Sequence, residues 1–160
     1  MKTVTKLFLS LCLVSLGATL TAHAQIRSDA TIRANIPHSF VVNNTTLPEG
    51  SYVITLADPD ASELNELEIR SANGKTAVLF DTEPVSVPGT ASATELVFDK
   101  VGDTYFLSRV FLKGDAGGNQ VLKSKKQRRL EETGSIAESH SIAASVEQAK
   151  SSKPAVRKTN

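Results

Sequence analysis

The sequence predicts an all-β protein, a small antiparallel sandwich or barrel of about six or seven strands. Two observations lead to this prediction. Apolar residues alternate with polar ones in short runs over residues 31–112, and turn-forming residues separate these runs at short intervals. No apolar run of helical length interrupts them, so the chain has no room for the crossover helices that a parallel sheet requires.

Residues 1–24 have the three parts of a secretory signal peptide, which makes Gln25 the expected mature N-terminus. Lys2 and Lys6 form the positive segment, an apolar run follows, and Ala-His-Ala supplies the small residues of a cleavage site. The alternative is a membrane anchor, but the apolar run is shorter than the roughly 20 residues that a spanning helix needs. We therefore expect export to a periplasmic or extracellular location, with no transmembrane segment after cleavage.

Removal of the signal peptide leaves 136 of the 160 residues, with 16 basic and 17 acidic side chains. A nearly neutral chain has no overall attraction to nucleic acid, so no nucleic-acid partner is expected. Cleavage also removes the only cysteine of the chain. The mature protein therefore has no disulfide and no thiol nucleophile, and its stability must come from a hydrophobic core.

The first predicted strand covers residues 31–42, where apolar side chains recur at every second position and His38 shares their register. Pro37 lacks an N–H group and marks an edge or a bulge. Residues 43–50 are predicted to be a turn-rich loop, and residues 51–56 are predicted to form the next strand.

The remaining predicted strands are separated by two loops, at residues 57–64 and 83–90, and by two tight turns. Asn73-Gly74 is a strong hairpin signal, because a type I′ turn requires positive φ at both central residues. The predicted strands span residues 65–70, 75–80, 92–101 and 104–112.

The strand at 104–112 carries apolar residues on both sides, which predicts a central strand covered on two faces. One side has Phe106, Val110 and Leu112, and the other has Tyr105, Leu107 and Phe111.

The composition changes after Leu112. Residues 113–120 are predicted to be a flexible loop, and the charged segment 121–132 a strand end or a short helix. Residues 133–160 are rich in Ser, Ala, Glu and Lys, with no aromatic residue and only a thin apolar face. We therefore predict a β domain over residues 25–132, followed by a mostly disordered or weakly helical tail.

His38 is the first candidate for chemistry, and we interpret it as a scaffold residue. A metal site needs several converging ligands, and none lies near His38 in the sequence. Its neighbour Ser39 would point to the opposite face of a strand, so His38 is poorly placed to act as its general base. His140 falls in the predicted tail.

Two groups of acidic residues are candidates for a calcium site or for an acid–base pair. Asp58, Asp60 and Glu63 share a loop but lack the glycine and the terminal glutamate of a calcium-binding EF-hand. Glu95 and Asp99 share one strand face but lie about 13 Å apart, too far for a glycosidase pair unless the strand bends. We expect no catalytic residue, no metal and no cofactor.

The densest charged segment is a possible anion-binding patch. Aromatic residues are absent from it, so stacking on bases is not expected, while Glu131 and Glu132 offset part of its charge. The patch consists of Lys123, Lys125, Lys126, Arg128 and Arg129.

The run from Ile36 to Ile54 resembles a family of small exported bacterial β proteins of the acidobacterial type. In that family, Ile-Pro-Phe-x-Phe-x-Val is followed by Leu-Pro-Ala-Gly-x-Tyr. His38 and Glu49 stand where the family usually has Phe and Ala, and the resemblance covers residues 30–132. The family implies no particular activity. The matching positions are Ile36, Pro37, Phe40, Val42, Leu47, Pro48, Gly50 and Tyr52.

These features predict an exported cell-envelope protein with a non-enzymatic binding or structural role. Its expected partner is an envelope protein or an anionic glycan or lipid surface. The alternative is a small hydrolase, or a carrier that holds an apolar ligand inside a barrel. A deep pocket with converging polar groups would favour the alternative, and a filled core would favour the binding role.

Overall fold

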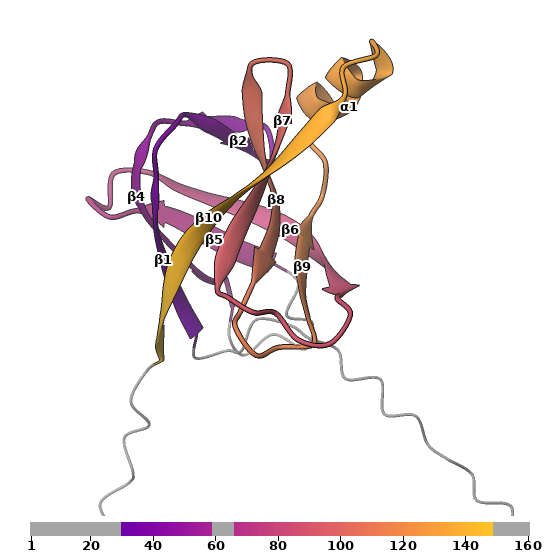
Figure 1. Ribbon diagram of the computed structural model, residues 1–160. Coiled ribbons are helices and arrows are strands. Elements are labelled where there is room, and N and C mark those ends of the chain that lie inside the picture. The colour runs from indigo at the N-terminus through magenta and orange to yellow at the C-terminus, as the bar shows by residue number, and fades with distance from the viewer. Residues whose placement is uncertain (1–29, 59–65, 149–160) are drawn as a thin grey trace, which may run out of the picture.

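The computed structural model describes residues 30–58 and 66–148, which form a β-barrel with one short helix (Figure 1). The elements in chain order are β1 (Ala30–Ile36), β2 (Phe40–Val42), β3 (Thr45–Leu47), β4 (Gly50–Leu56), β5 (Glu66–Ser71), β6 (Ala77–Ser86), β7 (Glu95–Val101), β8 (Thr104–Phe111), β9 (Gly117–Val121), α1 (Lys125–Glu132) and β10 (Ala137–Gln148).

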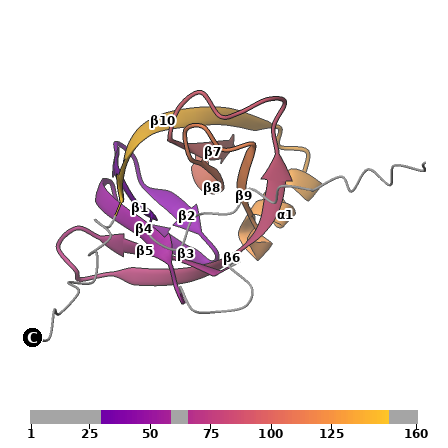
Figure 2. The same ribbon diagram turned by 90° about the horizontal axis from the view of Figure 1, so that it is seen from below.

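Eight of the ten strands close the barrel. The order around it is β1-β4-β5-β6-β9-β8-β7-β10, and β10 pairs with β1 to complete the ring. Every neighbouring pair in the ring is antiparallel, and Figure 2 shows the strands encircling the core. The predicted all-β antiparallel class is confirmed, and of the two expected architectures the barrel is the one observed. The prediction of six or seven strands was too low.

The two additional strands, β2 and β3, form a hairpin beside β8. The turn is Asn43-Asn44, and the φ of Asn43 is 54°, a left-handed conformation that Asn tolerates. β2 runs parallel to the first residues of β8, whereas β9 pairs with its last residues. The predicted loop at 43–50 therefore contains β3, one of the strands that bring the total above the predicted six or seven.

The inward-facing side chains of the strands form one continuous core. The period-two pattern puts Ile32, Ile36, Ile54 and Ile69 inside, each with an exposed fraction of 1 % or less. Phe40 contacts Tyr52 and Phe98 edge to face, with ring centroids 5.2 and 5.5 Å apart.

β8 is covered on both faces, as predicted, but the two sets of side chains differ from those expected. A bulge at Ser108 shifts the register, because Val97 faces Arg109 while the next residue, Phe98, faces Leu107. Leu107 and Val110 therefore both join the main core. On the other face, α1 covers a second cluster made of Phe106, Val41, Val101 and Leu130.

Two predicted loops are partly strand, over residues 83–86 and 117–120. β6 continues to Ser86, and its Pro84 lies beyond the end of β5, where β6 has no β5 residue to pair with. The segment predicted as a flexible loop contains β9. A Cβ at Gly118 would lie 2.5 Å from Phe111 Cδ1 and would also meet the Val110 carbonyl oxygen. This glycine therefore permits close strand packing rather than flexibility.

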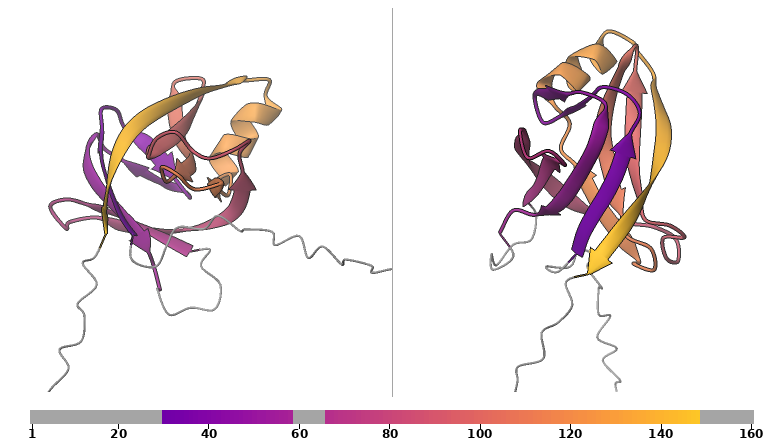
Figure 3. Two further views of the ribbon diagram at one scale, coloured as in Figure 1. Left: turned by 60° about the horizontal axis from the view of Figure 1, so that its bottom comes forward. Right: turned by 90° about the vertical axis from the view of Figure 1, so that its left-hand side faces the viewer.

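The prediction of a mostly disordered or weakly helical tail was wrong for residues 137–148, which form β10. This strand pairs with β7 through its first half and with β1 through its second half (Figure 3). Each half of β10 pairs with one neighbouring strand, and this pairing holds the segment in a strand although few of its side chains are apolar. Ile142 and Ala144 are among those that pack against the main core. Residues 149–160 and the predicted signal peptide lie outside the described residues.

α1 is a helix, one of the two alternatives for this charged segment. Ser124 caps it, since its hydroxyl accepts a hydrogen bond from the Gln127 N–H at 3.1 Å. The helix lies at the end of the barrel opposite to the start of β1 and the end of β10, which pair with each other (Figure 1). Within the ranges 30–58 and 66–148, no helix has the length and hydropathy to cross a membrane.

Candidate functional site

The exposed side of α1 carries most of the predicted anion-binding patch. Gln127 is buried and Leu130 is half-buried against the second cluster, so the opposite side of the helix faces solvent. We define the cationic face as the four exposed basic residues of the helix, Lys125, Lys126, Arg128 and Arg129.

The two glutamates that follow this patch have different roles. Glu131 Oε2 lies 2.7 Å from Lys123 Nζ, and Glu131 Oε1 accepts a hydrogen bond from Gln127 Nε2 at 3.2 Å. Glu131 therefore neutralises Lys123, the fifth residue of the predicted patch. Glu132 is the remaining carboxylate on the helix and is exposed. The cationic face keeps a net positive charge.

The charge order along α1 opposes the helix dipole. Lys125 and Lys126 stand at the positive N-terminal end, and the first turn has no acidic residue. Such placement costs about 0.3–1 kcal/mol per charge in exposed helices. Two of the N-terminal N–H groups have polar side-chain acceptors, because Asn44 Oδ1 accepts from the Lys125 N–H at 3.3 Å and the Ser124 hydroxyl accepts from the Gln127 N–H at 3.1 Å. Helix stability therefore does not explain these lysines.

A second group of polar side chains surrounds Tyr105, near the turn between β7 and β8. The His38 ring stacks on the Tyr105 ring with a centroid separation of 3.7 Å and an interplanar angle of 14°. His38 also meets Phe98 edge to face, with centroids 5.3 Å apart. Lys100 Nζ lies 5.7 Å from the Tyr105 ring centroid. His38 thus belongs to an aromatic cluster, which agrees with its interpretation as a scaffold residue.

His140 joins this cluster, although the sequence placed it in a tail. Its ring lies 5.5 Å from Tyr105 in an edge contact, and its Nε2 lies 3.8 Å from Glu138 Oε2. The buried His38 Nδ1 has no hydrogen-bond partner among the described residues. Within that part of the chain, no group of three or more His, Cys, Asp and Glu side chains converges as a metal site would require.

The acidic candidates do not come together. Asp99 accepts hydrogen bonds from Ser108 at 2.7 Å and from Ser139 at 3.0 Å, so it fastens the β8 bulge to β10. Glu95 lies at the other end of β7. Asp58 is exposed at the end of the first described segment, and the two loop acids Asp60 and Glu63 lie outside the described residues.

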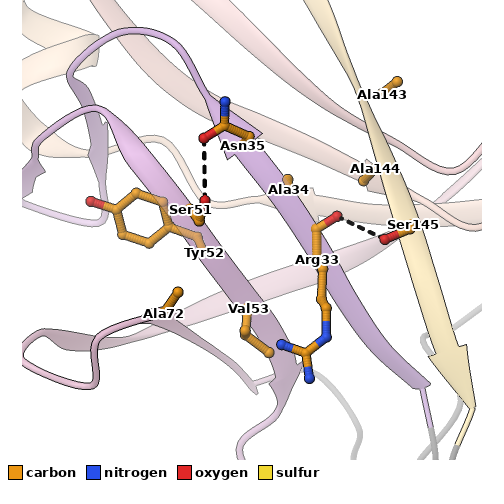
Figure 4. A pocket seen from close by; sticks show the side chains of 10 residues that line it. All are labelled: Arg33, Ala34, Asn35, Ser51, Tyr52, Val53, Ala72, Ala143, Ala144 and Ser145. Carbon is orange, nitrogen blue, oxygen red and sulfur yellow. Dashed lines mark hydrogen bonds between the residues drawn. The ribbon is translucent and has the colours of Figure 1, made fainter.

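An open hollow of about 470 Å³ lies on the outer face of β10, β1 and β4 (Figure 4). Small side chains such as Ser51, Ala143 and Ser145 line most of it. Arg33 is the one charged residue in this lining, and its Nε donates to Glu147 Oε2 at 3.0 Å. This hollow therefore presents little chemistry for a specific ligand.

The sequence did not predict three features of these surfaces: the stacking partner Tyr105, the position of His140, and the orientation of Glu131. Each depends on residues distant in sequence or on which side of a helix is buried.

Comparison of the chain with protein-family models, with curated proteins and with solved structures found no match.

Proposed function

We propose that this protein is an exported, non-enzymatic binding protein of the cell envelope, and that the cationic face of α1 attaches it to a polyanionic surface. The observation that carries the proposal is the arrangement of charge on α1. Four basic side chains are exposed on one helix, while Glu131 is engaged by Lys123 and Gln127. Such a face attracts phosphate, sulfate or carboxylate groups that repeat along a surface.

The barrel supports this role as a rigid base for the helix. Leu130 packs against Val41 and Phe106, which belong to two different strands. Lys125 is tied to the hairpin turn through Asn44, and the Arg128 guanidinium donates to the Lys123 carbonyl at 2.8 Å. The backbone that carries the charges is therefore ordered before a partner binds, which lowers the entropic cost of binding.

The alternative of an internal apolar-ligand carrier has less support. Large side chains occupy the barrel interior, among them Phe40, Phe80 and Phe98, each with an exposed fraction of 2 % or less. The acidic candidates are also not arranged as an acid–base pair around a cleft. These observations favour a surface role over a role inside the barrel.

Heparin, a soluble polyanion, provides a direct test. Protein purified from the exported fraction should be retained on heparin resin and elute with salt, because counterion release weakens such contacts. Lys125→Glu with Arg129→Glu should elute at clearly lower salt. The matched control is Lys75→Glu with Lys113→Glu, which makes the same charge change at exposed sites outside α1. Equal elution of both double variants would refute the proposed function.

Export is tested separately, since it rests on the signal-peptide pattern. Sequencing of the N-terminus of the exported protein should begin at Gln25. Recovery of the protein with Met1 intact in a membrane fraction would contradict export with cleavage.

A further inference from the structure

Two exposed aliphatic side chains bracket the cationic helix. Leu122 precedes α1 by three residues and is 45 % exposed, and Ile136 follows it by four residues and is 86 % exposed. Among the described residues, four large hydrophobic residues are exposed, and the other two are Leu79 and Val146. Half of these exposed apolar residues therefore lie immediately beside the one helix that carries the cationic face.

This combination fits a lipid bilayer better than a soluble polyanion. Aliphatic side chains next to a polyanionic glycan would gain little, whereas at a bilayer they enter the boundary between headgroups and acyl chains. Lysine and arginine beside them contact the anionic headgroups. Glycan and nucleic-acid sites commonly use aromatic stacking, and residues 122–136 contain no aromatic side chain.

The position of α1 in the fold also suits contact with a flat surface. The helix lies at one end of the barrel, while the start of β1 and the end of β10 lie at the other end (Figure 1). This end can therefore approach a membrane without interference from the described ends of the chain.

A small hollow of about 250 Å³ lies beside Ile136, between the β7–β8 turn and the segment that follows α1. Its lining includes Lys100, Gly102, Ser135 and Glu138. The Lys100 ammonium and the Ser135 hydroxyl are groups that hydrogen-bond a headgroup phosphate, and Glu138 lies 3.8 Å from His140. Lys100 thus adds a basic group to the hollow beside Ile136, which Glu138 in the same lining offsets in part.

We infer that the α1 end of the barrel docks on the surface of an anionic lipid bilayer, with the cationic face on the headgroups and with Leu122 and Ile136 inserted at the interface. This inference rests on the proposed function, because it names the polyanionic surface that the cationic face binds. It requires both kinds of side chain, whereas binding to a polyanion in general requires only the charges.

The test uses sedimentation with vesicles, and protein from the exported fraction so that the signal peptide is absent. Wild-type protein should sediment with phosphatidylglycerol–phosphatidylcholine vesicles and stay in solution with pure phosphatidylcholine vesicles. Leu122→Ser with Ile136→Ser should weaken vesicle binding by about tenfold or more, because two aliphatic side chains no longer leave water, while its elution from heparin stays unchanged. Leu79→Ser, at a residue that is 49 % exposed, should bind as the wild type does.

The two proposals fail in different ways. Retention on heparin without binding to anionic vesicles would overturn the bilayer inference and leave the proposed function standing. A wild-type protein that neither stays on heparin nor binds anionic vesicles would overturn both the proposed function and the bilayer inference. Equal vesicle binding by the wild type and the Leu122→Ser, Ile136→Ser variant would also overturn the bilayer inference. If circular dichroism shows that the double variant is unfolded, Ile136→Ser alone replaces it, because this side chain is almost fully exposed. About a threefold loss of vesicle binding is then expected.

Discussion

The imidazole of His38 lies almost parallel to the phenol ring of Tyr105, with the two ring centroids 3.7 Å apart. His38 follows β1 and Tyr105 is in β8, so this stack joins segments that are 67 positions apart in the sequence. Phe98 contacts the edge of the same imidazole. The site therefore has the geometry of an aromatic cluster that includes the histidine rings of His38 and His140.

His38→Phe should leave the free energy of unfolding unchanged or raise it. Phenylalanine keeps the stack on Tyr105, and it removes a buried Nδ1 that has no described hydrogen-bond partner. Denaturant unfolding measures the effect, with His38→Ala as the control that deletes the ring and should cost about 2 kcal/mol or more. A loss of more than about 2 kcal/mol for His38→Phe would mean that the imidazole makes a required polar contact or that the site cannot enlarge. If the variant is stable but no longer binds heparin or vesicles, the scaffold interpretation is wrong.

Tyr52→Phe should lower the free energy of unfolding by about 1 kcal/mol at neutral pH, because the Tyr52 hydroxyl donates to the Pro48 carbonyl oxygen at 2.7 Å. Burial raises the pKa of Tyr52 above its ordinary value of 10.0. The unfolded chain then loses this proton at a lower pH than the folded protein does. The stability due to the neutral hydroxyl is therefore complete below pH 10.0 and decreases as the pH rises through the folded-state value.

Unfolding of the wild type and of Tyr52→Phe over a series of pH values measures this dependence. The stability difference between the two proteins should shrink in alkaline solution, while effects of the other titrating groups cancel in the comparison. A difference that stays constant across this range would contradict the raised pKa.

Gly118→Ala should destabilise the barrel by about 2 kcal/mol or more. The new methyl group would overlap the Phe111 ring and the Val110 carbonyl oxygen, both in the neighbouring strand β8. Gln120→Ala, at an exposed position of the same strand, is the control and should change stability little. Equal thermal midpoints for the two variants would show that β8 and β9 can separate without cost.

Truncation after Glu132 should abolish cooperative unfolding, because it removes β10 from between β1 and β7 and opens the barrel. A chain that ends at Gln148 retains every described strand and is the matched control. Thermal melting followed by circular dichroism compares the two. A midpoint within about 5 °C of the control, a shift equivalent to roughly 1 kcal/mol, would mean that the barrel does not need β10.

The sequence by itself determined the class of the fold and several of its elements. The period-two pattern predicted β4 and the strand at 31–42, which the structure divides into β1 and β2, because a strand with one buried face records that burial in its own residues. Apolar runs predicted β7 and β8. The turns at Asn73-Gly74 and Gly102-Asp103 were also local, because Gly74 and Gly102 adopt positive φ values of 71° and 60°. Asn73 does not have a positive φ, so the type I′ geometry expected for its turn is not the one observed. The basic cluster of residues 123–129 was visible for the same reason, because its members are closely spaced in the sequence.

Only the tertiary structure decided how the barrel closes and how the charges are arranged. β9 and β10 lack a strong apolar pattern, and they are strands because they pair with neighbours that include segments distant in sequence, β6 for β9 and β1 and β7 for β10. The bulge at Ser108 divides the side chains of β8 between two clusters, which strict alternation cannot predict. Glu131 pairs with Lys123, eight residues earlier in the chain, because the chain that enters α1 lies beside the last turn of the helix. Each outcome depends on contacts between segments that are far apart in the chain or on burial, and neither is encoded in a local run of residues.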